Sequence, residues 1–111
     1  MKFEIEVTDE QIDKICSDVL HNLPECCYSF RCVRWKYEPE WNFTFHGVEE
    51  DEGKTFTLTW GKAREAVIAT IKRYLDKGHY TVSQLLTDPD WDAPMIDEVI
   101  QQALLGEVIY G

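Results

Sequence analysis

The chain has few basic residues and few residues that break regular structure. Lys and Arg number 11 against 21 Asp and Glu, and 111 residues include only 6 Gly and 4 Pro. A formal charge of −10 repels nucleic acid, so we expect no direct nucleic-acid partner. No Pro- or Gly-rich linker, repeat or low-complexity run divides the sequence, and 44% of its residues are hydrophobic. Residues 1–111 are therefore expected to form one folded domain.

Long apolar runs are also missing. No stretch reaches the roughly 18 consecutive apolar residues of a membrane span, and residues 1–6 lack the apolar run of a signal peptide. We therefore expect a cytoplasmic protein with no membrane partner.

The motifs that usually identify enzymes are absent. The sequence contains no Gly-x-Ser-x-Gly, His-Glu-x-x-His or Gly-rich phosphate loop. Its three histidines, His21, His46 and His79, lie far apart, so a Cys–His pair could arise only through the fold. We expect a non-enzymatic protein with no catalytic residues and no cofactor.

The four cysteines do not follow zinc-ligand spacing. Zinc sites usually take their ligands from pairs such as Cys-x-x-Cys, which this sequence lacks. Adjacent Cys26 and Cys27 would point to opposite faces of a strand, and the absence of a secretory signal disfavours a disulfide. We favour buried or half-buried thiols and no metal site for Cys16, Cys26, Cys27 and Cys32.

Asp88, Asp90 and Asp92 have the spacing that opens an EF-hand loop. The match then fails, because Ala93 stands where the turn needs Gly and Val99 where a bidentate Glu is needed. We interpret this stretch as an Asp-Pro turn that leads to a helix N-cap at Asp92.

Alternating apolar and polar residues predict three strands near residues 28–37, 41–46 and 54–60. An acidic loop from Gly47 to Lys54 joins the second strand to the third. In the first strand the apolar parity changes near Cys32, which predicts a bulge or bend there, or a strand covered on both faces.

Apolar residues at helical spacing predict helices near residues 9–22, 62–77 and 93–105. Thr8 and Gln11 fit a capping box at the start of the first helix. Gly78 and Gly106 are placed to end the second and third helices.

These elements predict an α+β fold, with a small antiparallel three-stranded sheet packed on one face by three helices. Alternation in residues 3–7 and an apolar tail at 108–110 could add short edge strands at the two termini.

Arg31, Arg34 and Lys36 alternate with aromatic residues, as in proteins that bind single-stranded nucleic acid. Regular alternation would place Arg34 and Lys36 on one face and Arg31 with Trp35 on the other, so such a platform would be incomplete. We favour a core strand whose basic side chains are solvated.

Six acidic residues are the candidates for partner binding. The first four lie in the loop between the second and third strands, and the last two lie on the expected outer face of the C-terminal helix. The candidates are Glu49, Glu50, Asp51, Glu52, Asp97 and Glu98.

The sequence resembles a family of small phage and prophage proteins of Firmicute and gut bacteria. The segments that carry the resemblance are residues 7–12, 54–59, 90–93 and 100–111, the last reading IQQALLGEVIYG. The family offers no catalytic residues to transfer. The resemblance implies a setting inside a bacterial host cell.

Charge and resemblance together suggest a non-enzymatic accessory protein that binds a host protein, for counter-defence or by mimicking a nucleic-acid site. The alternative is a small-ligand or metal-binding module that uses the cysteine region or the acidic turn before the last helix.

Overall fold

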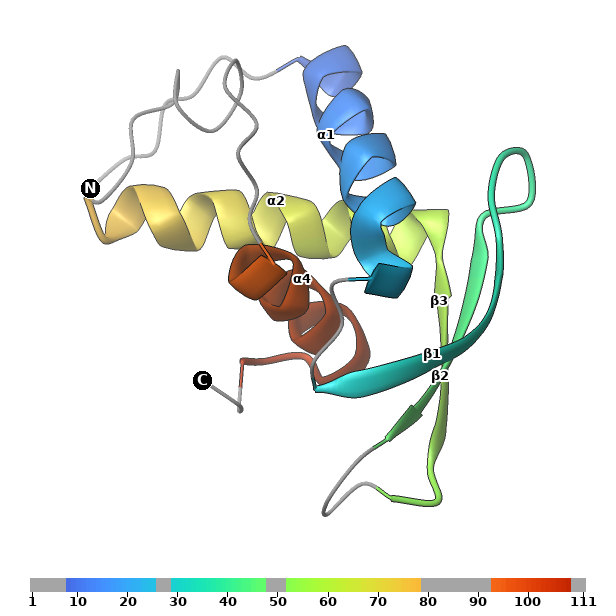
Figure 1. The fold of residues 1–111 in the computed structure, drawn as a ribbon. Helices are drawn as coiled ribbons and strands as arrows, with labels where there is room; N and C mark the ends of the chain where they lie inside the picture. The colour runs from blue at the N-terminus through green and yellow to red at the C-terminus, as the bar shows by residue number, and fades with distance from the viewer. Residues whose placement is uncertain (1–7, 26–28, 48–51, 79–92, 109–111) are drawn as a thin grey trace.

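The computed structural model describes residues 8–25, 29–47, 52–78 and 93–108. Within these ranges the chain forms a helix, a short 3-10 turn, three strands of one sheet and then two further helices (Figure 1). Their bounds are α1 (Asp9–Asn22), η1 (Leu23–Glu25), β1 (Phe30–Lys36), β2 (Asn42–Gly47), β3 (Thr55–Thr59), α2 (Trp60–Asp76) and α4 (Ala93–Leu105).

Helix α1 begins at the predicted capping box. The Thr8 hydroxyl accepts a hydrogen bond from the Gln11 amide at 3.2 Å, and the Gln11 side chain accepts one from the Thr8 amide at 3.0 Å. Two amide groups at the helix start are thereby satisfied. The predicted apolar stripe is confirmed, because its members are all buried: Ile12, Ile15, Cys16, Val19, Leu20 and Leu23.

The sheet is antiparallel, with strand order β1-β2-β3. Phe43 pairs with Leu58 and Phe45 with Phe56, so these apolar side chains share one face of the sheet, called here the inner face. Phe43, Phe45 and Leu58 are fully buried.

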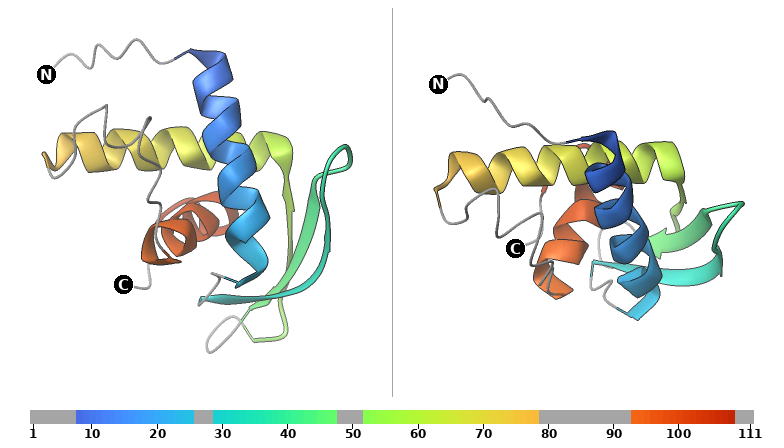
Figure 2. Two further views of the ribbon diagram at one scale, coloured as in Figure 1. Left: turned by 45° about the horizontal axis from the view of Figure 1, so that its top comes forward. Right: turned by 90° about the horizontal axis from the view of Figure 1, so that it is seen from above.

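The three described helices, α1, α2 and α4, lie on the inner side of the sheet (Figures 1 and 2). The polar residues of β2 and β3 form an outer face that no described helix covers. The predicted α+β fold, with one sheet and three helices in contact on one side, is confirmed. None of the described helices is long and apolar enough to cross a membrane.

Strand β1 carries the predicted irregularity. Cys32 pairs with Phe45 and Arg34 pairs with Thr44, so Val33 is an extra residue between two neighbouring pairs. This bulge reverses the side-chain parity along β1. Arg31, Arg34 and Lys36 therefore all point to the outer face, which corrects the expectation that Arg31 shares a face with Trp35.

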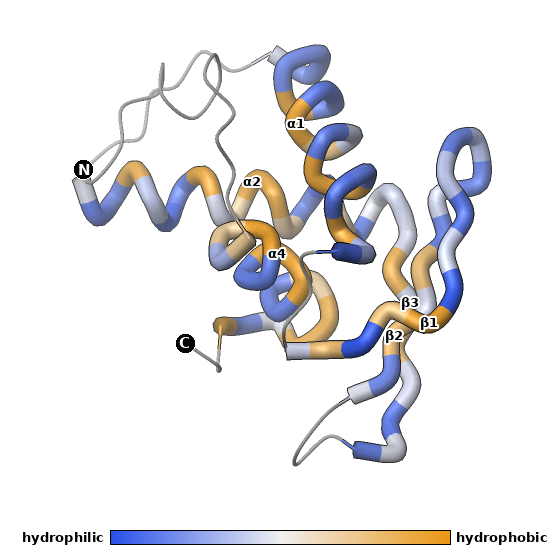
Figure 3. The backbone as a smooth tube through the Cα atoms, in the orientation of Figure 1, coloured by the Kyte–Doolittle hydropathy of each residue, from blue (hydrophilic) through white to orange (hydrophobic). Residues whose placement is uncertain are grey.

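Helix α2 begins at Trp60 rather than at residue 62, and the third strand ends one residue earlier than predicted. Thr59 is the N-cap, with an extended backbone. Trp60 continues the apolar–polar alternation of β3. The alternation alone therefore does not show where the strand ends and helix α2 begins. Figure 3 shows apolar and polar residues alternating along α1 and α2, as expected for amphipathic helices.

An ion-pair cluster joins α2 to α1. Arg64 donates hydrogen bonds to the carboxylates of Asp13 and Asp9, each at 2.8 Å. The bond to Asp13, followed by the bond to Asp9, raises the pKa of Arg64. Asp9 is almost fully exposed, so we assign this cluster a role in orienting the two helices rather than a large share of stability.

Helix α4 ends as predicted. Gly106 has a φ of 79°, the left-handed conformation that favours glycine after a helix, and its amide bonds to the Gln102 carbonyl at 3.1 Å. The apolar stripe of α4 packs into the same core as α1, α2 and the sheet. The expected N-terminal edge strand and the N-cap at Asp92 lie outside the described residues. In the C-terminal tail, Val108 is not part of a strand.

Candidate functional site

Strand β1 is far more exposed than β2. Five of its seven residues, Arg31 and residues 33–36, are exposed, whereas β2 alternates between buried and accessible positions. The large exposed hydrophobic residues of the described ranges also belong to this segment: Val33 is 41% exposed, Trp35 45% and Tyr37 36%. β1 and the residue that follows it therefore expose three large hydrophobic side chains, which alternate in sequence with Arg34 and Lys36.

The position of Trp35 explains its exposure. Trp35 pairs with the buried Phe43 and so lies on the inner face of the sheet. The turn that joins β1 to β2 projects past the helices (Figures 1 and 2). In the same row of the sheet Phe43 and Leu58 are fully buried, so the inner face is covered there, and Trp35 is exposed because β1 is the edge strand.

Aromatic rings gather around the turn between β1 and β2. Tyr37 stacks on His21 of α1 with ring centroids 4.9 Å apart, and its hydroxyl donates to the His21 carbonyl at 3.5 Å. Trp41 lies 5.4 Å from His21 and 5.0 Å from Trp60, again between centroids. We call the cluster of His21, Tyr37, Trp41 and Trp60, together with the exposed Trp35 of the adjoining strand β1, the aromatic ledge.

One residue of the aromatic ledge, Trp41, has an unfavourable backbone conformation. Trp41 has a φ of 35°, which is uncommon for a bulky residue. Such backbone conformations cost about 1 to 3 kcal/mol and persist where surrounding contacts enforce them. The packing of Trp41 against the rings of Trp60, Tyr37 and His21 supplies contacts of this kind.

On the opposite side of β1, the outer face carries a row of basic side chains. Arg31 is opposite His46, Arg34 opposite Thr44, and Lys36 opposite Asn42. Lys36 forms a salt bridge with Glu40, with 3.6 Å between Nζ and Oε2. Arg31 and Arg34 form no salt bridge with any described residue. β1 therefore combines apolar and basic side chains in a protein whose formal net charge is −10.

The acidic candidates have a different distribution from the one expected. Glu49, Glu50 and Asp51 lie outside the described residues. Glu52 is exposed and forms an isolated bridge with Gly47 at the end of β2. Glu52 is thus available to a partner.

The expected outward orientation of Asp97 is wrong. Asp97 is only 7% exposed and accepts hydrogen bonds from the Ser29 amide at 2.9 Å, the Ser29 hydroxyl at 2.6 Å and the Gln101 side chain at 2.9 Å. A buried carboxylate is tolerated only when its oxygens are well bonded. Asp97 therefore acts as a structural link between α4 and the start of β1.

Glu98 is also turned toward the protein. Its carboxylate accepts a hydrogen bond from the Tyr74 hydroxyl and lies 3.5 Å from the Arg73 guanidinium. Arg73 also donates to the Gln102 side chain at 3.0 Å. These bonds join α4 to α2, so the expected acidic outer face of α4 is replaced by an interhelical polar network.

The described cysteines show no reactive environment. Cys16 is fully buried, and burial, followed by the nearby charge of Asp13, raises the pKa of its thiol to about 12. Cys32 is half-buried, with its Sγ 3.9 Å from the Arg34 carbonyl. Cys26 and Cys27 lie outside the described residues, as do the three aspartates of the predicted turn.

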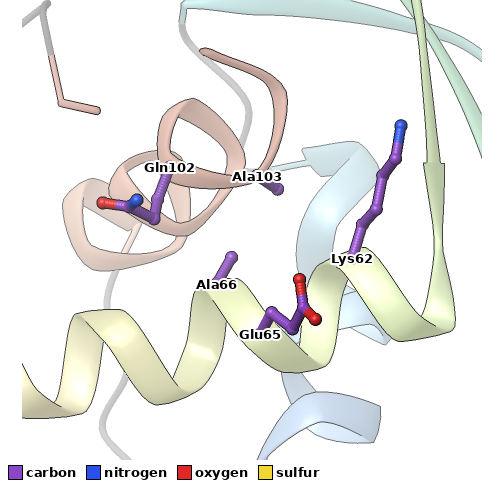
Figure 4. A pocket seen from close by; sticks show the side chains of 5 residues that line it. All are labelled: Lys62, Glu65, Ala66, Gln102 and Ala103. Carbon is purple, nitrogen blue, oxygen red and sulfur yellow. The ribbon is translucent and has the colours of Figure 1, made fainter. Parts of the chain in front are cut away.

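No group of three His, Cys, Asp or Glu side chains in the described part of the chain could hold a metal ion. A pocket of about 280 Å³ lies between α2 and α4 (Figure 4), and its lining residues are Lys62, Glu65, Ala66, Gln102 and Ala103. Gln102 is already bonded to Arg73 and to the Gly106 carbonyl, and Lys62 and Glu65 are exposed. This pocket offers no buried polar group to orient a ligand.

No protein-family model, curated protein or solved structure matches this chain. The resemblance to phage and prophage proteins therefore stays a prediction.

We predict that Asp97→Ala lowers the free energy of unfolding by about 2 to 3 kcal/mol, because three donors lose a charged acceptor in a buried place. Asp18→Ala, an exposed change on α1, is the control and should alter it by less than about 0.5 kcal/mol. Urea unfolding measures both values. Equal effects of the two substitutions would refute the structural role of Asp97.

We predict that Cys16 resists alkylation in the native protein. At a pKa of about 12, against an ordinary 9.0, the reactive thiolate is about a thousandfold scarcer near neutral pH, and burial further blocks the reagent. Iodoacetamide labelling followed by peptide mass analysis should show Cys16 modified in urea but not in native buffer. Similar labelling rates in the two conditions would contradict the buried placement.

Proposed function

We propose that the chain is a non-enzymatic phage or prophage accessory protein that acts by binding a host protein, and that β1 with the aromatic ledge is its binding surface. The phage setting rests on the sequence resemblance. The observation that carries the binding proposal is the exposure of Val33 and Trp35 on the edge strand β1 and of Tyr37 directly after it.

Exposed aromatic residues support a protein-binding role for a physical reason. Trp and Tyr are enriched among the residues that dominate interface energies, since they bury a large area with few rotatable bonds. A small acidic domain could instead bury its Trp and Tyr side chains in its core. Here Trp35 is directly beside the core residue Phe43 in the sheet, yet nearly half of its surface remains in solvent.

The acidic residues take a secondary part in this proposal. Asp97 and Glu98 are engaged inside the protein, as described above, so they are not proposed as contacts with a partner. Glu38 and Glu40 are exposed at the turn between β1 and β2, next to the ledge. Such rim charges mainly affect association rate and specificity, rather than the strength of the bound complex.

We predict that Trp35→Ala weakens binding to the host partner by at least about tenfold, the effect of losing an aromatic interface anchor. Tagged wild-type protein, Trp35→Ala and the exposed helix variant Lys72→Ala would be used for capture from a Firmicute lysate. Proteins recovered by the wild type and Lys72→Ala, but not by Trp35→Ala, would then be titrated as purified partners.

Thermal unfolding of each variant would establish that the fold is intact. The proposal fails if wild-type protein recovers no host protein above background. It also fails if Trp35→Ala binds the purified partner as tightly as the wild type does.

A further inference from the structure

No strand in the described ranges pairs with the outer edge of β1. β1 is the first strand in the order β1-β2-β3, and β2 occupies only one of its two edges. Among the described residues, no backbone group forms a hydrogen bond with the other edge. An edge of this kind presents backbone N–H and C=O groups that can bond to another extended segment.

The two faces of this edge have different chemistry. The outer face presents Arg31, Arg34 and Lys36, all three aligned by the bulge at Val33. The inner face presents Trp35, followed by Tyr37. A strand added to the edge would place alternate side chains beside basic groups and beside aromatic rings.

We propose that the β1 edge binds an extended segment of the partner protein in which acidic and apolar side chains alternate. The segment adds a fourth strand to the sheet, with its acidic side chains beside Arg34 and Lys36 and its apolar side chains beside Trp35. This inference rests on the proposed function and specifies the class of partner and the mode of binding.

Charge complementarity favours this occupant over the alternatives. The basic row is a local exception in a protein with a formal charge of −10, so a short acidic segment can match it locally. A long nucleic acid would also meet the repulsion of the remaining surface. Two β1 edges would place Arg and Lys side chains against each other, which disfavours pairing between copies of this chain.

The bulge at Val33 determines where the regularly paired end of β1 begins. Regular pairing resumes at Arg34 and continues to Lys36. These three residues, together with Tyr37, form the part of the edge that combines regular geometry, basic charge and aromatic surface. We therefore place the centre of the binding site at Trp35 and expect Arg34 and Lys36 to select for acidic side chains.

The test uses a synthetic peptide of alternating valine and glutamate, titrated into isotope-labelled protein and followed by NMR. A valine–lysine peptide of equal length is the matched control. We expect the acidic peptide alone to shift the amide resonances of residues 33–36. Arg34→Glu should weaken its binding by at least about tenfold, whereas Lys72→Glu, the same charge change on α2, should change it by less than about twofold.

Several outcomes would overturn the inference. These are no binding by the acidic peptide, equal binding of the two peptides, binding unaffected by Arg34→Glu, or stronger shifts of the same amides by single-stranded DNA. None of them would affect capture of a host protein through Trp35, so this inference can fail while the proposed function stands. Conversely, peptide binding at β1 without any host partner would refute the proposed function alone.

Discussion

The buried carboxylate of Asp97 is the constraint on which the arrangement of helices and sheet depends. It accepts hydrogen bonds from the amide and hydroxyl of Ser29, which lies 68 residues away in the sequence. A charged group in such a place is destabilising unless it is fully bonded, so the helix and the residue before β1 can adopt few other relative positions. Gln101, one turn further along α4, completes the network and is itself buried.

Because of this anchoring, the two ends of β1 have different surroundings. Its start is tied to α4, and Phe30 is buried beside it. At its far end Trp35, on the edge of the sheet, and Tyr37, which stacks on His21 of α1, are partly exposed to solvent. A fixed strand with an exposed end is a rigid support for an interaction surface, and rigid surfaces lose little conformational entropy on binding. The structural link and the proposed binding surface are thus two parts of one strand.

The sequence predicted most of the fold because hydrophobic periodicity reports a single buried face. It therefore located α1 and the sheet well. The change of parity near Cys32 predicted a bulge, a bend or a strand covered on both faces, and the structure has the bulge. It failed at Asp97, since α4 is enclosed on more than one side and its polar residues bond to each other and to Ser29. The exposure of Trp35 was missed for the converse reason. Local pattern places it on the inner face but does not show that β1 is the edge strand of the sheet.

The most direct test of the anchoring role of Asp97 is native-state hydrogen exchange at the amide of Ser29. Ser29 lies outside every helix and strand, yet its amide donates to a buried carboxylate. We therefore predict that this amide exchanges as slowly as the core amides of β2, through global unfolding. Rapid exchange, typical of an exposed connecting segment, would show that the carboxylate does not hold the start of β1 and would contradict the account.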